Sequence, residues 1–516
     1  MEIEIPPKHE TNIGSMSNEQ DGEESPEYRD LAQVAFAYND FYDEDASFHA
    51  TALTYAEMLW ETAVSAAPIG LQFVIPAGAF FLNTLFISMK ADPNTVSAVG
   101  LGDSVFILSL FALMDGANWG IAVLVSQSFG AKDYKHCGIH YHRGIVVSYI
   151  LYTFIALLIC FSDKIFIYIC HYDEEISMLT WHYLLYGLSP MTLMVFFNTT
   201  RTFLLGQSAY VGQFVITLIG EIFQVALAYY FIMVQDQENK TKALAIARIV
   251  GEAVKVIGVL IFCSCWDYFK ETFFWPIKQS FHGIWKQFWY QIDLGSLQLL
   301  NHVGTELNIL VAGFLTSEEL AAQALAMKLF LVQTIPGSAI GRVTATKAAQ
   351  CVGARKIEEA RQYVICGAIV LTVCCCIVTL TSLLHIDYLA AFLTNDETVE
   401  SHLKTALFWW ALILPGESAL VFQSIILRSL GEQRNSLKYL ILLEFFVGFP
   451  YQVIVGLVYQ FRLPGIIQGY LIAVCLLSVV YFFLYWKLDL EKRAEEIHQE
   501  KMLLAHAVEK DNNEIN

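Results

Sequence analysis

Apolar runs of about twenty residues alternate along the chain with short polar connections. A run of this length can cross the hydrocarbon core of a bilayer, which is about 30 Å thick. Most connections carry Gly, Pro, Asn or charged residues, as turns do. The pattern predicts twelve transmembrane helices, at about 64–88, 96–125, 144–169, 180–205, 211–234, 243–265, 290–315, 320–346, 362–385, 405–429, 437–459 and 464–486.

Both ends of the chain are polar. Residues 1–46 hold 13 acidic residues against Lys8 and Arg29, and we expect a disordered cytoplasmic tail because the segment is too polar to bury a core. The segment lacks the basic and short apolar regions of a cleavable signal peptide, so the first span is expected to act as the insertion signal. Residues 489–516 are expected to form a charged cytoplasmic C-terminal tail.

The longest connection, residues 266–289, divides the spans into six and six. It carries three lysines at eight-residue spacing among aromatic residues, which predicts a cytoplasmic linker helix lying in the membrane interface. We call residues 47–265, with spans 1–6, the N-lobe, and residues 290–488, with spans 7–12, the C-lobe.

Composition agrees with a membrane protein. Hydrophobic residues make up 56% of the chain and charged residues only 16%, whereas a soluble domain has about 25% charged residues. The net charge of −19 comes largely from the acidic tail, and the chain shows no basic face for nucleic acid. The 11 cysteines lie mostly in apolar stretches without CxxC or Cys/His spacing, so we expect packing cysteines and no metal site.

Lysine and arginine are distributed unequally between the two sides of the predicted spans. Loops 2–3, 6–7, 8–9 and 10–11, with their flanks, carry 13 of these residues, and the opposite loops carry six. The positive-inside rule therefore predicts that both termini are cytoplasmic. We expect a multi-pass integral protein of a plasma membrane or an organelle membrane.

Three landmarks of the N-lobe recur in the C-lobe in the same order. Gln127–Lys132 (QSFGAK) ends span 2, and Gln350–Arg355 (QCVGAR) ends span 8, at an offset of 223 residues. Two further pairs recur at nearly the same offset, Pro190 with Pro415 and Glu221 with Glu444. The repeat predicts two lobes related by an axis along the membrane normal around a central cleft, an architecture of transporters.

These motifs resemble the multidrug and toxic compound extrusion (MATE) family over about residues 57–490. The marks are Ala66-Ala67-Pro68, Leu124–Ala131 (LVSQSFGA), Gly353-Ala354 with Glu359-Ala360-Arg361, Glu417 eleven residues before Arg428, and Val447–Pro450 (VGFP). The resemblance implies an all-α, V-shaped fold of twelve transmembrane helices in two pseudo-symmetric six-helix lobes. It also implies an antiporter of the eukaryotic-like type, which expels organic and often cationic compounds against entering protons or sodium ions.

Span 7 carries a polar stripe. Gln298, His302 and Glu306 follow one another at four-residue spacing with Asn301 beside them, so they share one helix face. A carboxylate within a span is costly, and it is therefore a functional candidate. We expect this face to line the cleft, with Glu306 as a titratable binding group. The alternative is a polar contact between helices.

Glu417 and Lys328 are the other charged candidates of the C-lobe. Glu417 follows Pro415, which frees a backbone carbonyl and permits a bend, so we expect Glu417 to bind protons or cations unless it lies in headgroup water. The resemblance implies that Glu306 and Glu417 match positions where animal-type members carry essential glutamates. Lys328 lies in span 8 at the depth of Glu306, and we expect the two to pair or to share the cleft. An unpaired Lys328 would admit an anionic substrate or would snorkel to the interface.

Two asparagines depart from the family pattern. Asn83 stands where many bacterial members carry an aspartate of span 1, and Asn301 stands where many members carry the first glutamate of span 7. Since Asn cannot titrate, proton coupling is expected to rest on the C-lobe, with Glu306, Glu417 and His302.

The N-lobe spans contain further acidic residues. Asp103, Asp115 and Glu221 remain candidates for binding, and a structural role is the open alternative. In span 6, Arg248, Glu252 and Lys255 lie at helical spacing, and we expect them to satisfy one another's charge.

The sequence therefore predicts a proton-coupled or, alternatively, sodium-coupled exporter of small organic solutes that works as a monomer without a cofactor. We expect no enzyme, because no catalytic constellation appears. A lipid-linked oligosaccharide flippase of similar architecture is one alternative, but it would more often show several arginines in the cleft, and we identify none there. A receptor or scaffold is disfavoured by the repeat and by the acids within the spans.

Overall fold

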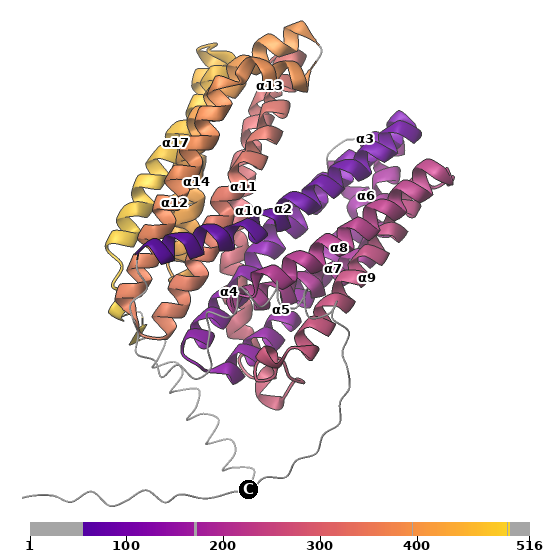
Figure 1. Ribbon diagram of the computed structural model, residues 1–516. Helices are drawn as coiled ribbons and strands as arrows, with labels where there is room; N and C mark the ends of the chain where they lie inside the picture. The colour runs from indigo at the N-terminus through magenta and orange to yellow at the C-terminus, as the bar shows by residue number, and fades with distance from the viewer. Residues whose placement is uncertain (1–54, 170–172, 395, 493, 496–516) are drawn as a thin grey trace, which may run out of the picture. The chain divides into compact units, whose positions relative to one another are not determined.

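Helices make up all the regular structure of residues 55–169, 173–394, 396–492 and 494–495, the residues that the computed structural model describes. They all belong to one compact unit, residues 52–516. The all-α expectation is confirmed (Figure 1). The acidic tail predicted at residues 1–46 and most of the C-terminal tail lie outside the described residues.

The N-lobe helices follow the six predicted spans. They are α2 (Tyr55–Lys90), α3 (Pro93–Phe106) continued through the π-helix η1 (Ile107–Met114) into α4 (Asp115–Gly130), α5 (Tyr134–Cys160), the short α6 (Ser162–Lys164) and η2 (Ile165–Ile169), α7 (Glu174–Gly206), α8 (Tyr210–Tyr229) continued by η3 (Tyr230–Val234), and α9 (Lys240–Cys265).

The C-lobe helices repeat this order. They are α10 (Ile284–Ala312), α11 (Ser317–Gly353), α12 (Ile357–Leu384), the short α13 (Ile386–Leu393), α14 (Glu397–Ser429), α15 (Gln433–Leu440) continued through η6 (Ile441–Gly448), α16 (Phe449–Tyr451) and η7 (Gln452–Val458), and α17 (Arg462–Trp486).

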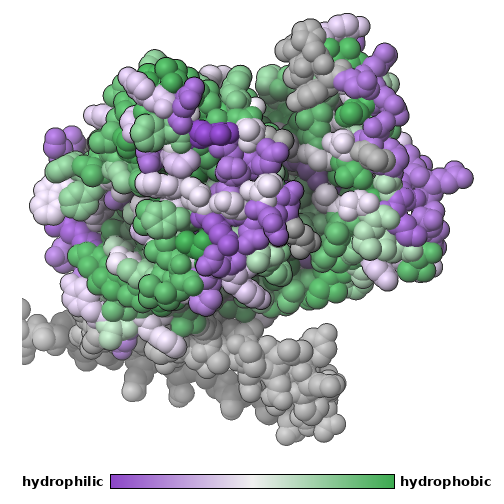
Figure 2. Space-filling view, turned by 90° about the horizontal axis from the view of Figure 1, so that it is seen from above, coloured by the Kyte–Doolittle hydropathy of each residue, from purple (hydrophilic) through white to green (hydrophobic). Residues whose placement is uncertain are grey.

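Within the described residues, one long helical segment covers each predicted span, and nine of these segments are long and apolar enough to cross a membrane. The other three are α7, α9 and α10, which carry more polar or charged residues. Figure 2 shows one face of the molecule, where apolar side chains cover much of the surface and hydrophilic side chains gather in patches among them. An apolar outer surface of this kind suits contact with lipid.

Short polar residues set the beginnings of several helices. Asp92 accepts a hydrogen bond from the backbone N–H of Thr95 (2.9 Å) and caps α3, which begins at Pro93, and the bonds from Thr95 lower the pKa of Asp92. Thr316 and Glu319 form a capping box at the start of α11. These caps satisfy backbone N–H groups that would otherwise lack partners at the ends of the spans.

The linker between the lobes differs from the predicted helix. Residues 266–283 contain only two short 3₁₀ turns, η4 (Asp267–Phe269) and η5 (Lys278–Phe281). Pro276 lies between the turns, and a proline disfavours helix both at its own position and at the residue before it. The prediction of one interfacial helix over residues 266–289 is therefore wrong.

The lobes pack on each other mainly through five helices. The helices α10 and α11 of the C-lobe pack on α4, and α2 packs on α11 and α12. One buried hydrophobic cluster crosses this contact, joining Ala66 and Trp119 of the N-lobe to Leu294, Val343 and Phe422 of the C-lobe. A smaller cluster also crosses, joining Met58 of α2 to Tyr363 and Cys366 of α12, whereas the buried residues of two others lie within single lobes.

The repeated glycine motifs meet at this contact. A Cβ atom on Gly130, at the end of α4, would overlap the backbone of Gln350. A Cβ atom on Gly353, at the end of α11, would overlap the backbone of Gln127. The contact is reciprocal, as expected of two segments related by a two-fold axis.

Candidate functional site

A buried carboxyl group marks the centre of the C-lobe. Glu417 lies two residues after Pro415 in α14 and is buried. The Tyr470 hydroxyl, on α17, lies 3.0 Å from Glu417 Oε2 and donates to it. Thr305 Oγ1, on α10, lies 3.2 Å from the same tyrosine hydroxyl. Three helices thus position one acid and two hydroxyl groups.

Glu444 completes this group. It lies on η6, is buried, and interacts electrostatically with Glu417. Its carboxyl group packs against Gly304 of α10, where a larger residue would overlap it. Among the described residues it has no hydrogen-bond partner. We call Glu417, Glu444, Tyr470 and Thr305 the carboxyl site.

The chemistry of the carboxyl site follows from its composition. Two neighbouring carboxylates in a low-dielectric environment repel each other, and both can stay ionised only with a counter-charge. No lysine or arginine of the described residues pairs with Glu417 or Glu444. The site can therefore hold a proton or a cation. From the sequence, Glu444 is recognised only as the repeat equivalent of Glu221, although an acid within an apolar run is already a sign of a functional residue.

The polar stripe of α10 does not form one group with Glu417. Gln298 Oε1 accepts a hydrogen bond from Arg428 Nη1 (2.7 Å), and His302 Nδ1 lies 3.2 Å from the backbone oxygen of Gln298. Asn301 and His302 are half-buried, and Glu306 is exposed. The stripe thus runs from a contact between helices at Gln298 to an exposed surface at Glu306.

The predicted pairing of Lys328 with Glu306 is not present. Both side chains are exposed, and neither has an ion pair or hydrogen bond with a described residue. Beyond their short connection, α11 packs mainly on α14 and α12 and touches α10 little. Equal depth along the two helices did not place the residues on facing sides.

Acidic residues within the N-lobe spans lie beside basic residues. Asp103 accepts hydrogen bonds from Tyr183 and Thr84, and Arg248 Nη2 lies 3.9 Å from its Oδ1. Arg248 Nη1 also donates to the Tyr183 hydroxyl (2.8 Å). Asn83 is fully buried, and its amide atoms have no hydrogen-bond partner in the described part of the chain.

Lys255 forms a buried triad with two acids. Its Nζ lies 2.6 Å from Glu252 Oε1 and 2.9 Å from Glu221 Oε1. The expected charge satisfaction within span 6 is therefore confirmed for Glu252 and Lys255. For Arg248 it is wrong, because that side chain turns to Asp103.

Asp115 lies among three arginines. It forms an ion pair with Arg342 of α11, and its Oδ1 lies 3.8 Å from Arg201 Nη2 of α7. Arg428 of α14 reaches the same region through Gln298, which accepts its hydrogen bond and packs against Gly116, the residue after Asp115. We call Arg201, Arg342, Arg428 and Asp115 the arginine cluster. Its residues come from both lobes, so the expectation that no arginines gather between the lobes is wrong. The three arginines are far apart in the sequence, and no local motif predicts that they come together.

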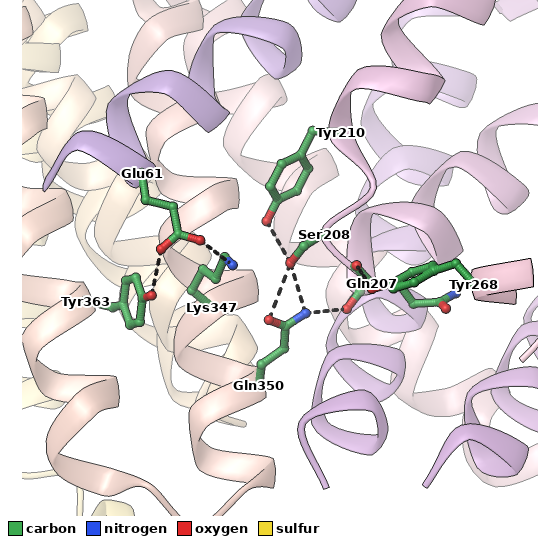
Figure 3. Close-up of polar contacts among 9 residues, drawn as sticks. Glu61, Gln207, Ser208, Tyr210, Tyr268, Lys347, Gln350 and Tyr363 are labelled. Atoms are coloured by element: carbon green, nitrogen blue, oxygen red, sulfur yellow. Dashed lines mark hydrogen bonds and ion pairs between the residues drawn. The ribbon is translucent and has the colours of Figure 1, made fainter. Parts of the chain in front are cut away.

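Polar contacts also join the lobes where the repeated motifs meet (Figure 3). Glu61 of α2 forms an ion pair with Lys347 of α11 (2.6 Å) and accepts a hydrogen bond from Tyr363 of α12 (2.7 Å). Gln350 Nε2 donates to the backbone oxygen of Gly206 (2.9 Å) and lies 3.1 Å from Ser208 Oγ. These contacts tie α2 and the turn after α7 to the C-lobe.

Comparison with known proteins places this geometry in one family. A model of the MatE family matches residues 68–230 and 297–454, one segment in each lobe. Protein DETOXIFICATION 18 of Arabidopsis thaliana is 20% identical over 390 residues, covering 75% of this chain and 82% of that protein. Multidrug and toxin extrusion protein 2 of Pongo abelii is 21% identical over 449 residues, covering 81% and 76%.

A solved structure shows the same fold. The eukaryotic MATE transporter AtDTX14 superposes with a TM-score of 0.79 at 15% identity, over 87% of this chain and 99% of that one. This agreement confirms the predicted fold class. Since the family model matches more than half of the residues, the chain belongs to the MatE family, whose members are membrane transporters and not enzymes.

Proposed function

We propose that this transporter is a secondary active antiporter that exports small organic cations in exchange for protons by alternating access. The observation that carries the proposal is the contrast between the lobes. Buried acids of the N-lobe lie against lysine or arginine, whereas Glu417 and Glu444 share a buried site without a basic partner among the described residues. Among the buried acids of the described helices, only those of the carboxyl site have no basic partner, so this site is free to exchange its counter-charge.

The exchange follows from simple competition. A proton neutralises one carboxyl group of the site, and a solute cation can take the same place when the proton leaves. Protons entering from one side would then release the cation, and the deprotonated site would bind the next one from the other side. Sodium is the alternative coupling ion, because carboxylate and hydroxyl oxygens also suit a hard cation.

Relatives support export of foreign or toxic solutes. The matched proteins of Arabidopsis thaliana and Pongo abelii are named for detoxification and for multidrug and toxin extrusion. We propose that the exposed Glu306 and Lys328, with Gln298, Asn301 and His302, contribute to solute binding. We further propose a monomer with both termini in the cytoplasm.

The arginine cluster favours a second candidate function. A flippase for lipid-linked oligosaccharides must bind a phosphate-bearing head group, and arginine binds phosphate well. The cluster lies between the lobes, where such a head group would pass.

Transport by the purified full chain in liposomes tests the proposal. We expect an imposed pH gradient to drive movement of the fluorescent cation ethidium, and Glu417→Gln to reduce the initial rate at least tenfold. The control is Glu397→Gln, an exposed acid of the same helix α14. Ethidium transport driven only by a sodium gradient would mean that sodium, and not the proton, is the coupling ion. Translocation of a labelled lipid-linked oligosaccharide without ethidium transport would favour the flippase.

A further inference from the structure

The arginine cluster carries more positive than negative charge. Arg201 and Arg342 pair with one acid, Asp115, and Arg428 has no acidic partner among the described residues. The side chains of Arg201, Arg342 and Asp115 are only 14%, 13% and 18% exposed, and Arg428 is buried. Arginine stays protonated in proteins, so the cluster has an excess of two positive charges. Glu252 also attracts Arg201, but it is already bonded to Lys255 in the triad.

An excess of buried charge needs a partner. Removing an ion from water costs several kcal/mol unless an opposite charge and hydrogen bonds compensate it. Gln298 and the backbone oxygen of Ser424 accept hydrogen bonds from Arg428, at 2.7 and 3.2 Å, but these neutral groups carry no charge. Arg342 Nε is buried and has no hydrogen-bond partner in the described part of the chain. The cluster therefore has unused donors as well as unbalanced charge.

Aromatic rings hold the arginine planes in place. The Arg342 guanidinium lies 4.9 Å from the Phe73 ring centre and 5.2 Å from that of Trp119, and Arg201 lies 5.8 Å from Phe73. Such stacking orients the guanidinium groups before any ligand arrives. The cluster is thus pre-organised for an acid with two oxygens, and Asp115 is such an acid.

The space beside the cluster is small in this structure. A cavity of about 10 Å³ is lined by Arg201 and Arg342 together with Gln72, Thr202 and Gln213, and this is room for about one water. Asp115 and Arg201 belong to the N-lobe and Arg342 and Arg428 to the C-lobe, so separation of the lobes would open the space and withdraw Asp115 from Arg342.

We propose that the arginine cluster is a binding site for an anionic group, a carboxylate or a phosphate, and that Asp115 occupies the site when no such group is bound. The inference rests on the proposed transport function, which it deepens. An acidic or zwitterionic solute would bind here, and a phospholipid head group offers the same chemistry. The carboxyl site and the arginine cluster would then recognise opposite charges.

Replacing Asp115, the acid that occupies the site, gives the most distinctive test. We expect Asp115→Asn to lower the melting temperature of the purified full chain, and added glutarate or inorganic sulfate to restore it, because the anion replaces the missing charge. Potassium chloride at equal ionic strength serves as the reference for general salt effects. The matched control is Asp293→Asn, which removes the exposed ion pair with Arg434 (2.7 Å) and should gain no such rescue.

The complementary test removes an arginine of the cluster and measures anion binding. We expect Arg428→Gln to weaken glutarate binding at least tenfold relative to the wild type, whereas Arg434→Gln should leave it unchanged. Equilibrium binding is measured by thermal shift without an ion gradient, so the result does not depend on proton coupling. Failure of gradient-driven ethidium transport would therefore count against the proposed function and leave this test intact.

Two preparations separate the sources of the anion. Protein in phosphatidylcholine nanodiscs should bind glutarate if the ligand is a free solute. Protein in nanodiscs that also contain phosphatidic acid should retain that lipid by mass spectrometry, and lose it in Arg428→Gln, if the ligand is a head group. The proposal is overturned if the wild type and Asp115→Asn show neither glutarate nor sulfate stabilisation beyond chloride and retain no phosphatidic acid. The wild-type titration decides the matter even if a variant does not fold.

Discussion

Acidic residues within the membrane-spanning helices have two kinds of environment, one with a basic partner and one without. In the N-lobe, acids are neutralised locally, as Lys255 shows by joining Glu221 and Glu252 over a few ångströms. In the C-lobe, Glu417 and Glu444 stay together with hydroxyl groups only. A charge that is already satisfied stabilises the fold, whereas one that lacks a fixed partner is available to a proton or a solute.

The triad gives a prediction at this scale. Lys255→Met should destabilise the protein by about 3–5 kcal/mol, because two buried carboxyl groups lose their shared cation. Thermal unfolding in one detergent measures the effect. The control is Lys270→Met, since Lys270 and Asp267 form an exposed ion pair on the linker, and such pairs contribute about 0–1 kcal/mol. Equal melting temperatures for the two variants would show that the triad adds no stability.

The helices are positioned by their ends and by their closest approaches. Capping residues and turns set where spans begin, and Pro276 divides the linker into two turns instead of one helix. Where α4 and α11 meet, glycine is required on both sides, because each backbone fills the space of the other residue's Cβ atom. The contact between lobes thus depends on residues that have no side chain.

A pair of glycine substitutions tests this contact. Gly353→Ala should destabilise the protein by about 1–3 kcal/mol, because the new Cβ atom would overlap the backbone of Gln127. Gly78→Ala is the matched change in α2, where nothing lies within 4 Å of the new atom, and it should be neutral or stabilising by up to about 1 kcal/mol. Thermal unfolding of both variants would show opposite signs. A destabilising Gly78→Ala of equal size would remove the argument from close approach.

The lobes are held together where the repeated motifs end, and transport by alternating access requires such contacts to break and re-form. Glu61, Lys347 and Tyr363 form one tie, and Gln350 with Ser208 forms another. The arginine cluster adds a third, through Asp115. The balance between these ties and any bound solute would set which conformation is populated.

Weakening one tie should shift that balance. We expect Lys347→Met to speed maleimide labelling of the half-buried Cys351, which lies in the same helix, in a variant whose other cysteines are replaced. Loss of about 1.4 kcal/mol from the closed contact corresponds to a tenfold change in population. The control is Lys356→Met, because Lys356 forms an ion pair with Glu359 (3.1 Å), which lies within the C-lobe near the start of α12. Unchanged labelling in Lys347→Met would mean that this pair does not restrain the lobes.

The sequence predicted most of the fold but only part of the candidate site. Length and polarity of the runs predicted all twelve spans. The repeat predicted that the motifs of Gly130 and Gly353 are related by symmetry, but it did not predict that they touch. Local signals identified Glu417, as an acid within a span two residues after Pro415, and the pair of Glu252 with Lys255, because i and i+3 positions are close on any helix. The arginine cluster, the role of Glu444 and the separation of Lys328 from Glu306 depend on how helices rotate and pack, which no local pattern records.

The central claim is that a proton and a solute cation compete for the carboxyl site. Equilibrium binding of ethidium to the purified protein as a function of pH tests it most directly. At high pH the site is deprotonated and binds the cation, and acidification should weaken binding by up to about tenfold per pH unit for one competing proton. We predict that Glu417→Gln and Glu444→Gln each bind ethidium weakly and with little pH dependence, while Glu397→Gln behaves as the wild type. Full affinity with the wild-type pH dependence in both carboxyl-site variants would contradict the claim.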